Sequence, residues 1–182
     1  MQNKRSNALV TSVTLAMLVA ISIISGKYLA IRGGEILRFS FENLPIILAG
    51  IAFGPISGAL TGIVADLVGC VMVGYAINPI VTVGAAAVGF FAGVSFDLLK
   101  KASLANNFSI VLTVAVSHII GSVLIKTYGL AIFYEMPVWM LMLWRLLNYV
   151  IVGAVEAFIL IVLLKNKEIS SKFMNKQRRK NK

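Results

Sequence analysis

Long apolar stretches alternate with short polar connections along this chain of 182 residues. A helix that crosses a bilayer needs roughly 20 predominantly apolar residues, or fewer where other segments of the protein shield it from lipid. Six stretches fit this description, the second of them short: residues 8–25, 43–53, 58–74, 79–99, 109–125 and 138–164. The pattern therefore predicts an all-α polytopic membrane protein with six transmembrane helices.

Composition agrees with this pattern and excludes a soluble domain. Hydrophobic residues make up 59% of the chain, charged residues only 13%, and the mean hydropathy is +0.91. A soluble chain of this length could not bury so much apolar surface. The first apolar stretch follows Lys4 and Arg5 but lacks a small-residue cleavage site and a soluble domain after it, so we interpret it as a permanent helix.

The net charge of +10 indicates topology, because the basic residues are concentrated in a few places. They gather near the N-terminus, at Lys100 and Lys101, and in the tail after residue 164. Positive charge marks the cytoplasmic side of a membrane, so both termini are predicted to lie inside a bacterial cell. We expect a membrane domain over residues 1–166 and a basic cytoplasmic tail over 167–182, which contacts lipid headgroups rather than nucleic acid.

The connections predicted to face outward are rich in aromatic residues. These are Tyr28, Phe39, Phe41, Tyr75, Tyr128, Phe133, Tyr134 and Trp139. Aromatic side chains at a membrane interface commonly anchor a protein in the headgroup layer. Interleaved with Arg, Asn and Glu, as in the segment LRFSFENLP, they could instead cover a pocket for a flat polar ligand. The pattern leaves both interpretations open.

Small residues recur at intervals of four in two places, which is typical of close helix packing in membranes. The first run predicts a tight hairpin of the second and third helices: Gly50, Gly54, Gly58 and Gly62. The second run, Ala16 and Ala20 in the first helix, either packs within the bundle or forms a docking face for a separate membrane subunit.

Ionisable groups inside a membrane are costly and by default face a cavity or the protein interior. The sequence places Asp66, His118, Arg145 and Glu156 within predicted helices, with Asn148 one turn after Arg145. A purely structural interpretation pairs Arg145 with Asp66 and leaves His118 hydrogen-bonded in the core. A functional interpretation places Arg145, Asn148 and His118 around an outward cavity, where Asp66 binds the nitrogens of a heterocycle and Arg145 binds a carboxylate.

Nothing in the sequence indicates catalysis, a metal site or a cofactor. Ser57 and His118 are the residues of a serine hydrolase, but the predicted topology places them about half a membrane apart. The only histidine and the only cysteine, Cys70, provide too few ligands for zinc. We therefore expect that the protein is not an enzyme.

Two segments carry a family resemblance: LRFSFENLPIILAGIAFGPISGALTGIVADLVG and, soon after it, GYAINPIVTVGAAAVGFFAG. They resemble the substrate-binding S components of energy-coupling factor (ECF) vitamin transporters, and most closely the folate-transporter family. The resemblance implies a six-helix protein that captures a vitamin from outside and has no ATPase of its own. It also implies partners: a membrane scaffold subunit that carries two cytoplasmic ATP-binding subunits. The segment AMLVA at residues 16–20 matches the family's alanine motif for scaffold contact, which assigns Ala16 and Ala20 to docking.

Folate suits such a site, because its pterin ring would stack on aromatic side chains and its glutamate tail would meet cationic groups. The predicted substrate-binding residues are Arg38, Phe39, Asn43, Asp66, Tyr75, Asn78, His118, Arg145 and Asn148. Two alternatives remain open. One is the same machine with another cargo, such as a queuosine precursor or pantothenate, and the other is a stand-alone secondary transporter or structural membrane subunit.

Overall fold

A computed structural model of the chain describes residues 2–33, 37–102, 104 and 106–165. Helices and two short strands follow one another along the chain, with η marking a π-helical segment. In order they are α1 (Gln2–Ile23), η1 (Ile24–Tyr28), β1 (Ile31–Gly33), β2 (Leu37–Phe39), α2 (Asn43–Phe53), α3 (Pro55–Val73), α4 (Pro79–Lys101), α5 (Asn106–Ser117), η2 (His118–Ile125), α6 (Lys126–Phe133) and α7 (Val138–Lys165).

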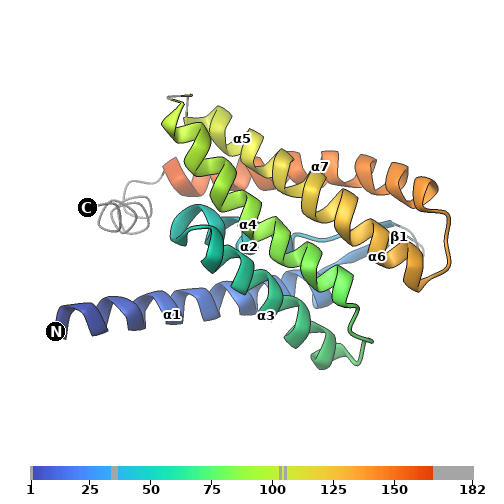
Figure 1. Cartoon of the computed structure of the whole chain (residues 1–182), viewed down its shortest axis with the longest axis horizontal. Helices are drawn as coiled ribbons and strands as arrows, with labels where there is room; N and C mark the ends of the chain where they lie inside the picture. Colours follow the sequence, from blue (N-terminus) through green and yellow to red (C-terminus); the bar gives the residue numbers. More distant parts are fainter. Residues whose placement is uncertain (1, 34–36, 103, 105, 166–182) are drawn as a thin grey trace.

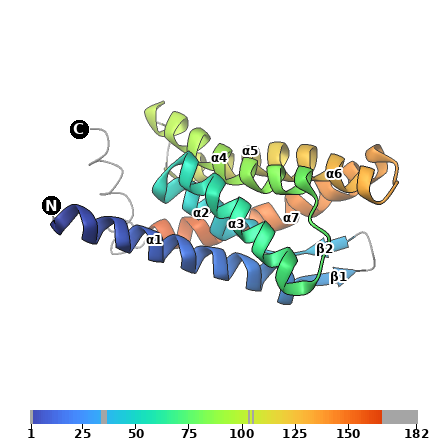
Figure 2. The ribbon, with the colours of Figure 1, turned by 60° about the horizontal axis from the view of Figure 1, so that its bottom comes forward.

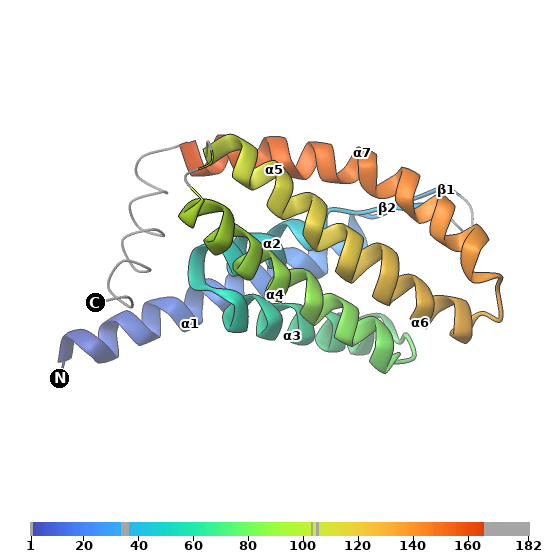
Figure 3. The same cartoon turned by 45° about the horizontal axis from the view of Figure 1, so that its top comes forward.

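The helices lie side by side along one long axis (Figure 1). The start of α1, the end of α4, the start of α5 and the end of α7 lie at one end of the molecule (Figures 1 and 3). The β1–β2 hairpin and the turn from α6 to α7 lie at the opposite end, as Figure 2 shows from another side. Lys100 and Lys101, which end α4, therefore share an end of the molecule with the first residues of α1.

Five helices of the described chain are long and apolar enough to cross a membrane: Ala8–Tyr28, Pro55–Val73, Pro79–Lys101, Asn106–Phe133 and Val138–Lys165. The second predicted segment, α2, has 11 residues, and at 1.5 Å per residue it extends only about 16 Å, roughly half of the hydrocarbon core. Its residues are buried almost throughout, so the surrounding helices shield it from lipid. The predicted multi-pass helical architecture is confirmed with five spans.

Two of the predicted connections have more structure than the sequence indicated. The first outer loop contains an antiparallel hairpin in which Ile31 pairs with Phe39, Arg32 with Arg38 and Gly33 with Leu37. The fifth helix was expected to end at residue 125, but it continues through η2 and α6 as one helical rod. Helix formation remains possible there because the charge of Lys126 is met by Glu42, so the rod need not end at a basic residue.

Glycine determines how closely α2, α3 and α4 approach. A Cβ atom on Gly58 would collide with the carbonyl oxygen of Gly89, and one on Gly89 would collide with that of Gly58. Lipid offers no hydrophobic drive for helix association, so contacts between backbones at small residues supply the packing instead. The tight hairpin of α2 and α3 that the glycine spacing predicts is confirmed. Its glycines also pack directly against the backbone of α4. We refer to this contact of α2, α3 and α4 as the glycine seam.

Candidate functional site

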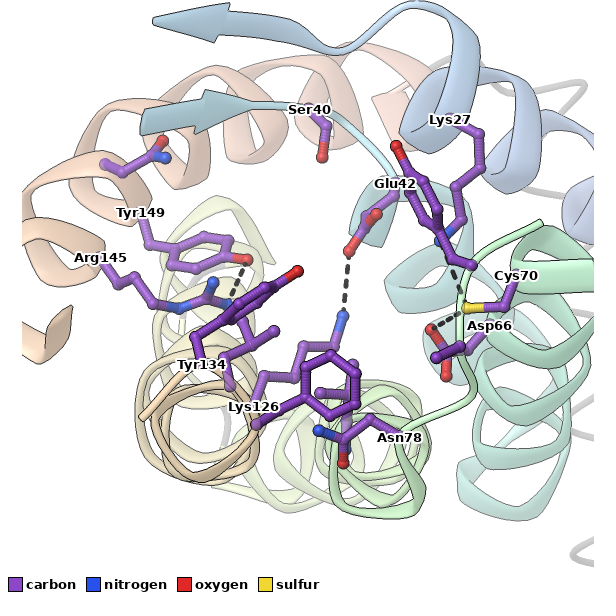
Figure 4. Close-up of a pocket in the computed structure, with 16 residues that line it drawn as sticks. Lys27, Ser40, Glu42, Asp66, Cys70, Asn78, Lys126, Tyr134, Arg145 and Tyr149 are labelled. Carbon is purple, nitrogen blue, oxygen red and sulfur yellow. Dashed lines mark hydrogen bonds and ion pairs between the residues drawn. The ribbon is translucent and has the colours of Figure 1, made fainter. Parts of the chain in front are cut away.

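A cavity of about 230 Å³ opens at the end of the molecule that carries the hairpin (Figure 4). Side chains from α3, α6, α7 and the segments around them line it. They are Lys27, Ser40, Glu42, Asp66, Cys70, Tyr75, Ala76, Asn78, Val81, Lys126, Leu130, Phe133, Tyr134, Arg145, Asn148 and Tyr149. The lining combines aromatic rings with charges of both signs, an unusual composition for the inside of a membrane bundle.

An ion pair crosses the cavity between α6 and the start of α2 (Figure 4). The ammonium Nζ of Lys126 lies 3.1 Å from Oε1 of Glu42 and donates a hydrogen bond of 3.2 Å to Oδ1 of Asn43. Asn43 in turn donates from Nδ2 to the hydroxyl of Ser122, over 3.2 Å. Lys126 is buried, so its charge requires a close anionic partner, and Glu42 provides one.

Arg145 lies on the α7 side of the cavity together with Tyr149. One terminal nitrogen of its guanidinium donates to the carbonyl oxygen of Ser122 and to the hydroxyl of Tyr149, each over 3.2 Å. The guanidinium carbon lies 5.3 Å from the centre of the Tyr149 ring, a cation–π distance. The buried Nε–H of Arg145 has no hydrogen-bond partner among the described residues. The guanidinium therefore has no carboxylate bound to it among the described residues.

Asp66 lies on the opposite side of the cavity, on α3, with Cys70 and Lys27 (Figure 4). Its Oδ2 accepts a hydrogen bond of 2.7 Å from the hydroxyl of Thr82, and the thiol of Cys70 lies 4.0 Å from its Oδ1. The Nζ of Lys27 is 3.7 Å from the sulfur of Cys70 and 5.5 Å from the centre of the Tyr75 ring. This side can accept hydrogen bonds from a ligand and stack an aromatic ring against it.

Asn78 has a structural task as well as a place in the cavity wall. Its Oδ1 accepts from the backbone N–H groups of Ile80 and Val81, at 3.0 and 3.4 Å, which caps the first turn of α4. Its Nδ2 donates to the carbonyl of Gly129 over 2.9 Å, which joins α4 to α6. Asn78 therefore holds two walls of the cavity together.

His118 and Glu156 form a separate buried pair away from the cavity. Nε2 of His118 lies 2.6 Å from Oε2 of Glu156, and both side chains are almost completely buried. The imidazole stacks on Tyr149 with ring centres 4.7 Å apart, and Nδ1 lies 3.4 Å from the hydroxyl of Ser122. His118 thus packs against Tyr149, which lines the cavity, but does not itself line it. Its contacts are those of a structural residue.

The structure brings together five of the nine predicted binding residues: Asp66, Tyr75, Asn78, Arg145 and Asn148 all line the cavity. Asn43 and His118 lie behind the wall. Phe39 is half-buried in β2 and is not among the lining residues. The backbone of Arg38 pairs with Arg32 in the hairpin, and its side chain lies outside what the structure describes.

Pairing of Arg145 with Asp66, the structural interpretation, is not seen among the described residues, where each side chain has the other partners given above. The sequence did not indicate Lys126 or Glu42, because each stood next to an apolar run and was assigned to a loop. Tyr149 was also missed. Its spacing of four from Arg145 on one helix face was the signal that could have found it.

Ala16 and Ala20 lie on the exposed side of α1. Their neighbours on that side are also apolar and exposed: Val13, Met17 and Ile24 have 53%, 61% and 50% of their surface accessible. Packing of the two alanines inside the bundle is therefore not what the structure shows.

No group of three or more potential metal-ligating side chains occurs in the part of the chain that the structure describes.

Comparison with known proteins gives a family and a fold. The family model of the ECF transporter substrate-specific component matches residues 10–164. A crystal structure of FolT bound with folic acid aligns with a TM-score of 0.64 and 20% identity, over 85% of this chain and 88% of that one. The S component for biotin from an ECF-type ABC transporter, solved at 2.1 Å, gives 0.69 and 18%, over 92% and 97%.

A third structure, the S component of a bacterial ECF transporter, gives a TM-score of 0.58 and 22% identity, over 91% of this chain and 95% of that one. No protein in the curated set matches the sequence. At these identities the structural likeness establishes the fold, and the cargo must be argued from the cavity.

Proposed function

The chain belongs to the family of ECF transporter substrate-specific components, and we propose that its cargo is folate or a related pteridine, captured in the cavity beneath the hairpin. Members of this family are membrane-embedded substrate-binding subunits that work with a scaffold subunit and ATP-binding subunits. For this chain we propose the same division of labour: it binds the vitamin from outside, and its partners supply ATP hydrolysis.

The observation that supports a pteridine is the separation of charge across the cavity. A pterin ring has an amino group and a neighbouring ring N–H that together donate to a carboxylate, and Asp66 offers one beside the ring of Tyr75. The other wall has Arg145 with an unpartnered Nε–H, near Tyr134 and Tyr149 (Figure 4). A flat ring bound at Asp66 and a carboxylate bound at Arg145 would satisfy both walls with one molecule.

The orientation of the protein forms part of the proposal. The first residues of α1 and the end of α4, with Lys100 and Lys101, share one end of the molecule, and the positive-inside rule assigns that end to the cytoplasm. The cavity then opens outward. A cysteine introduced by Glu135→Cys in a Cys70→Ala background should react with a membrane-impermeant maleimide on intact cells, whereas one introduced by Ala102→Cys should not; the reverse pattern would invert the topology.

Calorimetry on the purified protein in detergent tests the cargo. We expect folate to bind in a 1:1 ratio in the absence of nucleotide, and biotin and pantothenate to produce no binding heat at the same concentrations. Mass spectrometry of small molecules extracted from protein purified without added vitamin is the second measurement, and it should identify a pteridine. Binding heat from biotin with none from folate would contradict folate as the cargo and leave membership of the family untouched.

A further inference from the structure

The Lys126–Glu42 ion pair connects the cavity with α1, the helix that carries Ala16 and Ala20. Lys126 begins α6 and is 4% exposed, while Glu42 directly precedes α2. Both side chains line the cavity, so a bound cargo would lie against the pair itself. In the structure the ammonium lies between Glu42 and Asn43, at 3.1 and 3.2 Å.

Glu42 is also fixed to α1, on the side facing away from the exposed alanines. The hydroxyl of Ser22 donates a hydrogen bond of 2.6 Å to the backbone carbonyl of Glu42. Gly26 approaches the Glu42 side chain so closely that a Cβ atom there would lie 2.7 Å from Oε2 and 2.8 Å from Cβ of Glu42. One residue thus contacts the cavity cation on one side and two positions of the α1–η1 rod on the other.

The same residues border a further space between the cavity and α1. A second small cavity, of about 20 Å³, is lined by Ser22, Lys27, Glu42 and Lys126 together with residues of α2, α3 and α4. It is about large enough for a single water molecule. The Glu42 side chain is therefore not closely packed on every side, because it borders this small space together with Ser22 of α1.

We propose that Glu42 is a positioning residue that transmits occupancy of the cavity to α1, and so to the docking face around Ala16 and Ala20. The inference rests on the proposed function, because it needs a scaffold that contacts α1 and a cargo with two carboxylates, as on the glutamate tail of folate: one for Arg145 and a second for Lys126. An anion that approaches Lys126 competes with Glu42 for the ammonium. Glu42 then changes its position, and Ser22 and Gly26 change theirs with it.

A ligand shifts a conformational equilibrium only through contacts that differ between two states. Here the differing contact is the one between Lys126 and Glu42, which an anionic cargo replaces. The coupling is reciprocal, so docking of the scaffold must change cargo affinity by the same factor that cargo changes docking. A pair that served only to neutralise a buried lysine would produce no such coupling.

Ser22→Ala is the sharpest variant, because it removes the hydrogen bond from α1 to Glu42 and leaves the cavity lining intact. Ser22→Thr keeps the hydroxyl and serves as the rescue, and Ser25→Ala, one turn along on the same rod, serves as the matched control. Glu42→Gln removes the charge with little change of shape, but it leaves Lys126 buried without its anion and can destabilise the fold. It is therefore the second variant, interpreted only with its melting temperature.

Two measurements on the full chain test the proposal, both with folate as the probe. The first is hydrogen–deuterium exchange of the peptide that covers residues 22–28, with and without folate. The second is the dissociation constant for the purified scaffold and ATP-binding subunits, measured with and without folate. We expect the wild-type protein, Ser22→Thr and Ser25→Ala to show a folate-dependent change in exchange and a change in docking affinity of about fivefold or more.

In Ser22→Ala both changes should become clearly smaller, while folate affinity stays within about twofold of the wild type. Ser22→Ala with an unchanged folate effect on exchange and docking would overturn the inference, as would wild-type protein that binds folate with neither change. Both results would leave the proposed cargo standing. Absence of folate binding to the wild-type protein would instead overturn the proposed function, and the inference with it.

Discussion

The glycine seam and the cavity are built on opposite principles, although they lie in the same bundle. In the seam, backbones of α2, α3 and α4 meet directly, and small residues at fixed spacing are sufficient. In the cavity, charged and aromatic side chains from distant parts of the chain face one another across open space. The seam stabilises the fold, whereas the cavity provides the groups that would contact a cargo. Substitutions in the seam should therefore lower the melting temperature, and substitutions in the cavity should lower the affinity for the cargo.

The largest effect is expected in the seam. Gly89→Leu places a side chain where the carbonyl of Gly58 lies, and backbone cannot move aside as a flexible side chain can. We expect destabilisation of more than about 3 kcal/mol, above the usual range for overpacking, and little or no monodisperse protein in detergent. The matched control is Val83→Leu on an exposed position of α4, which should melt like the wild type. A Gly89→Leu protein with wild-type melting temperature would refute the close contact.

In the cavity, Arg145→Ala should affect binding and leave folding nearly unchanged. If the guanidinium meets a cargo carboxylate, affinity should fall by about 2–5 kcal/mol, or roughly 30- to 5,000-fold. Arg145→Lys retains the charge without the planar fork and should give an intermediate loss. Calorimetry with folate measures all three proteins, and Trp144→Leu is the control, since Trp144 is not among the cavity-lining residues. Unchanged affinity of Arg145→Ala would remove this residue from the site.

Asn78 contributes both to the fold and to the cavity, because it caps α4 and lines the cavity. Asn78→Ala should cost about 1 kcal/mol of stability through loss of the helix cap. Asn78→Asp keeps the acceptor for the backbone of α4 and loses the donor to Gly129, so it should recover the cap contribution. Thermal unfolding of the three proteins separates the two roles. Equal destabilisation by both substitutions would show that the bond to Gly129 matters more than the cap.

The smallest effect on cargo binding is expected on the exposed face of α1. Ala20→Trp adds bulk outside the bundle and should leave folate affinity within about twofold. If this face docks on the scaffold, uptake of labelled folate by cells should be abolished. Val162→Trp, on the exposed face of α7, is the control and should keep both binding and uptake. Uptake by Ala20→Trp at the wild-type rate would contradict docking of the scaffold on this face.

Much of the bundle could be predicted because its signals are local. The span boundaries follow from runs of apolar residues, and the close contact at Gly58 follows from the spacing of glycines in one segment. The exception is the end of the fifth helix. Lys126 was assigned to a loop because an unpaired cation is costly within a membrane helix, and its partner Glu42 lies 84 residues away in the sequence.

The sequence predicted which types of residue line the candidate site, but not which of the buried polar residues lie in the cavity and which pair behind its wall. Asp66 and Arg145 were both chosen because charges inside spans face a cavity, and the structure places both in its wall. The same rule chose His118, yet it pairs with Glu156 behind the wall, because burial by itself does not distinguish a cavity from a satisfied core. Asn43 likewise lies under the cavity, bonded to Lys126 and Ser122.

The membrane environment, the family and the places where helices pack closely could be predicted from the sequence, because apolar runs and glycine spacing are patterns within short segments of the chain. Only the tertiary structure decided which charges meet. The contacts of Lys126 with Glu42 and of Arg145 with Ser122 join distant parts of the chain. A hydrogen bond or ion pair forms only when two groups lie within a few ångströms of each other, and for these groups only the folded bundle brings them so close. A local sequence pattern therefore cannot predict them.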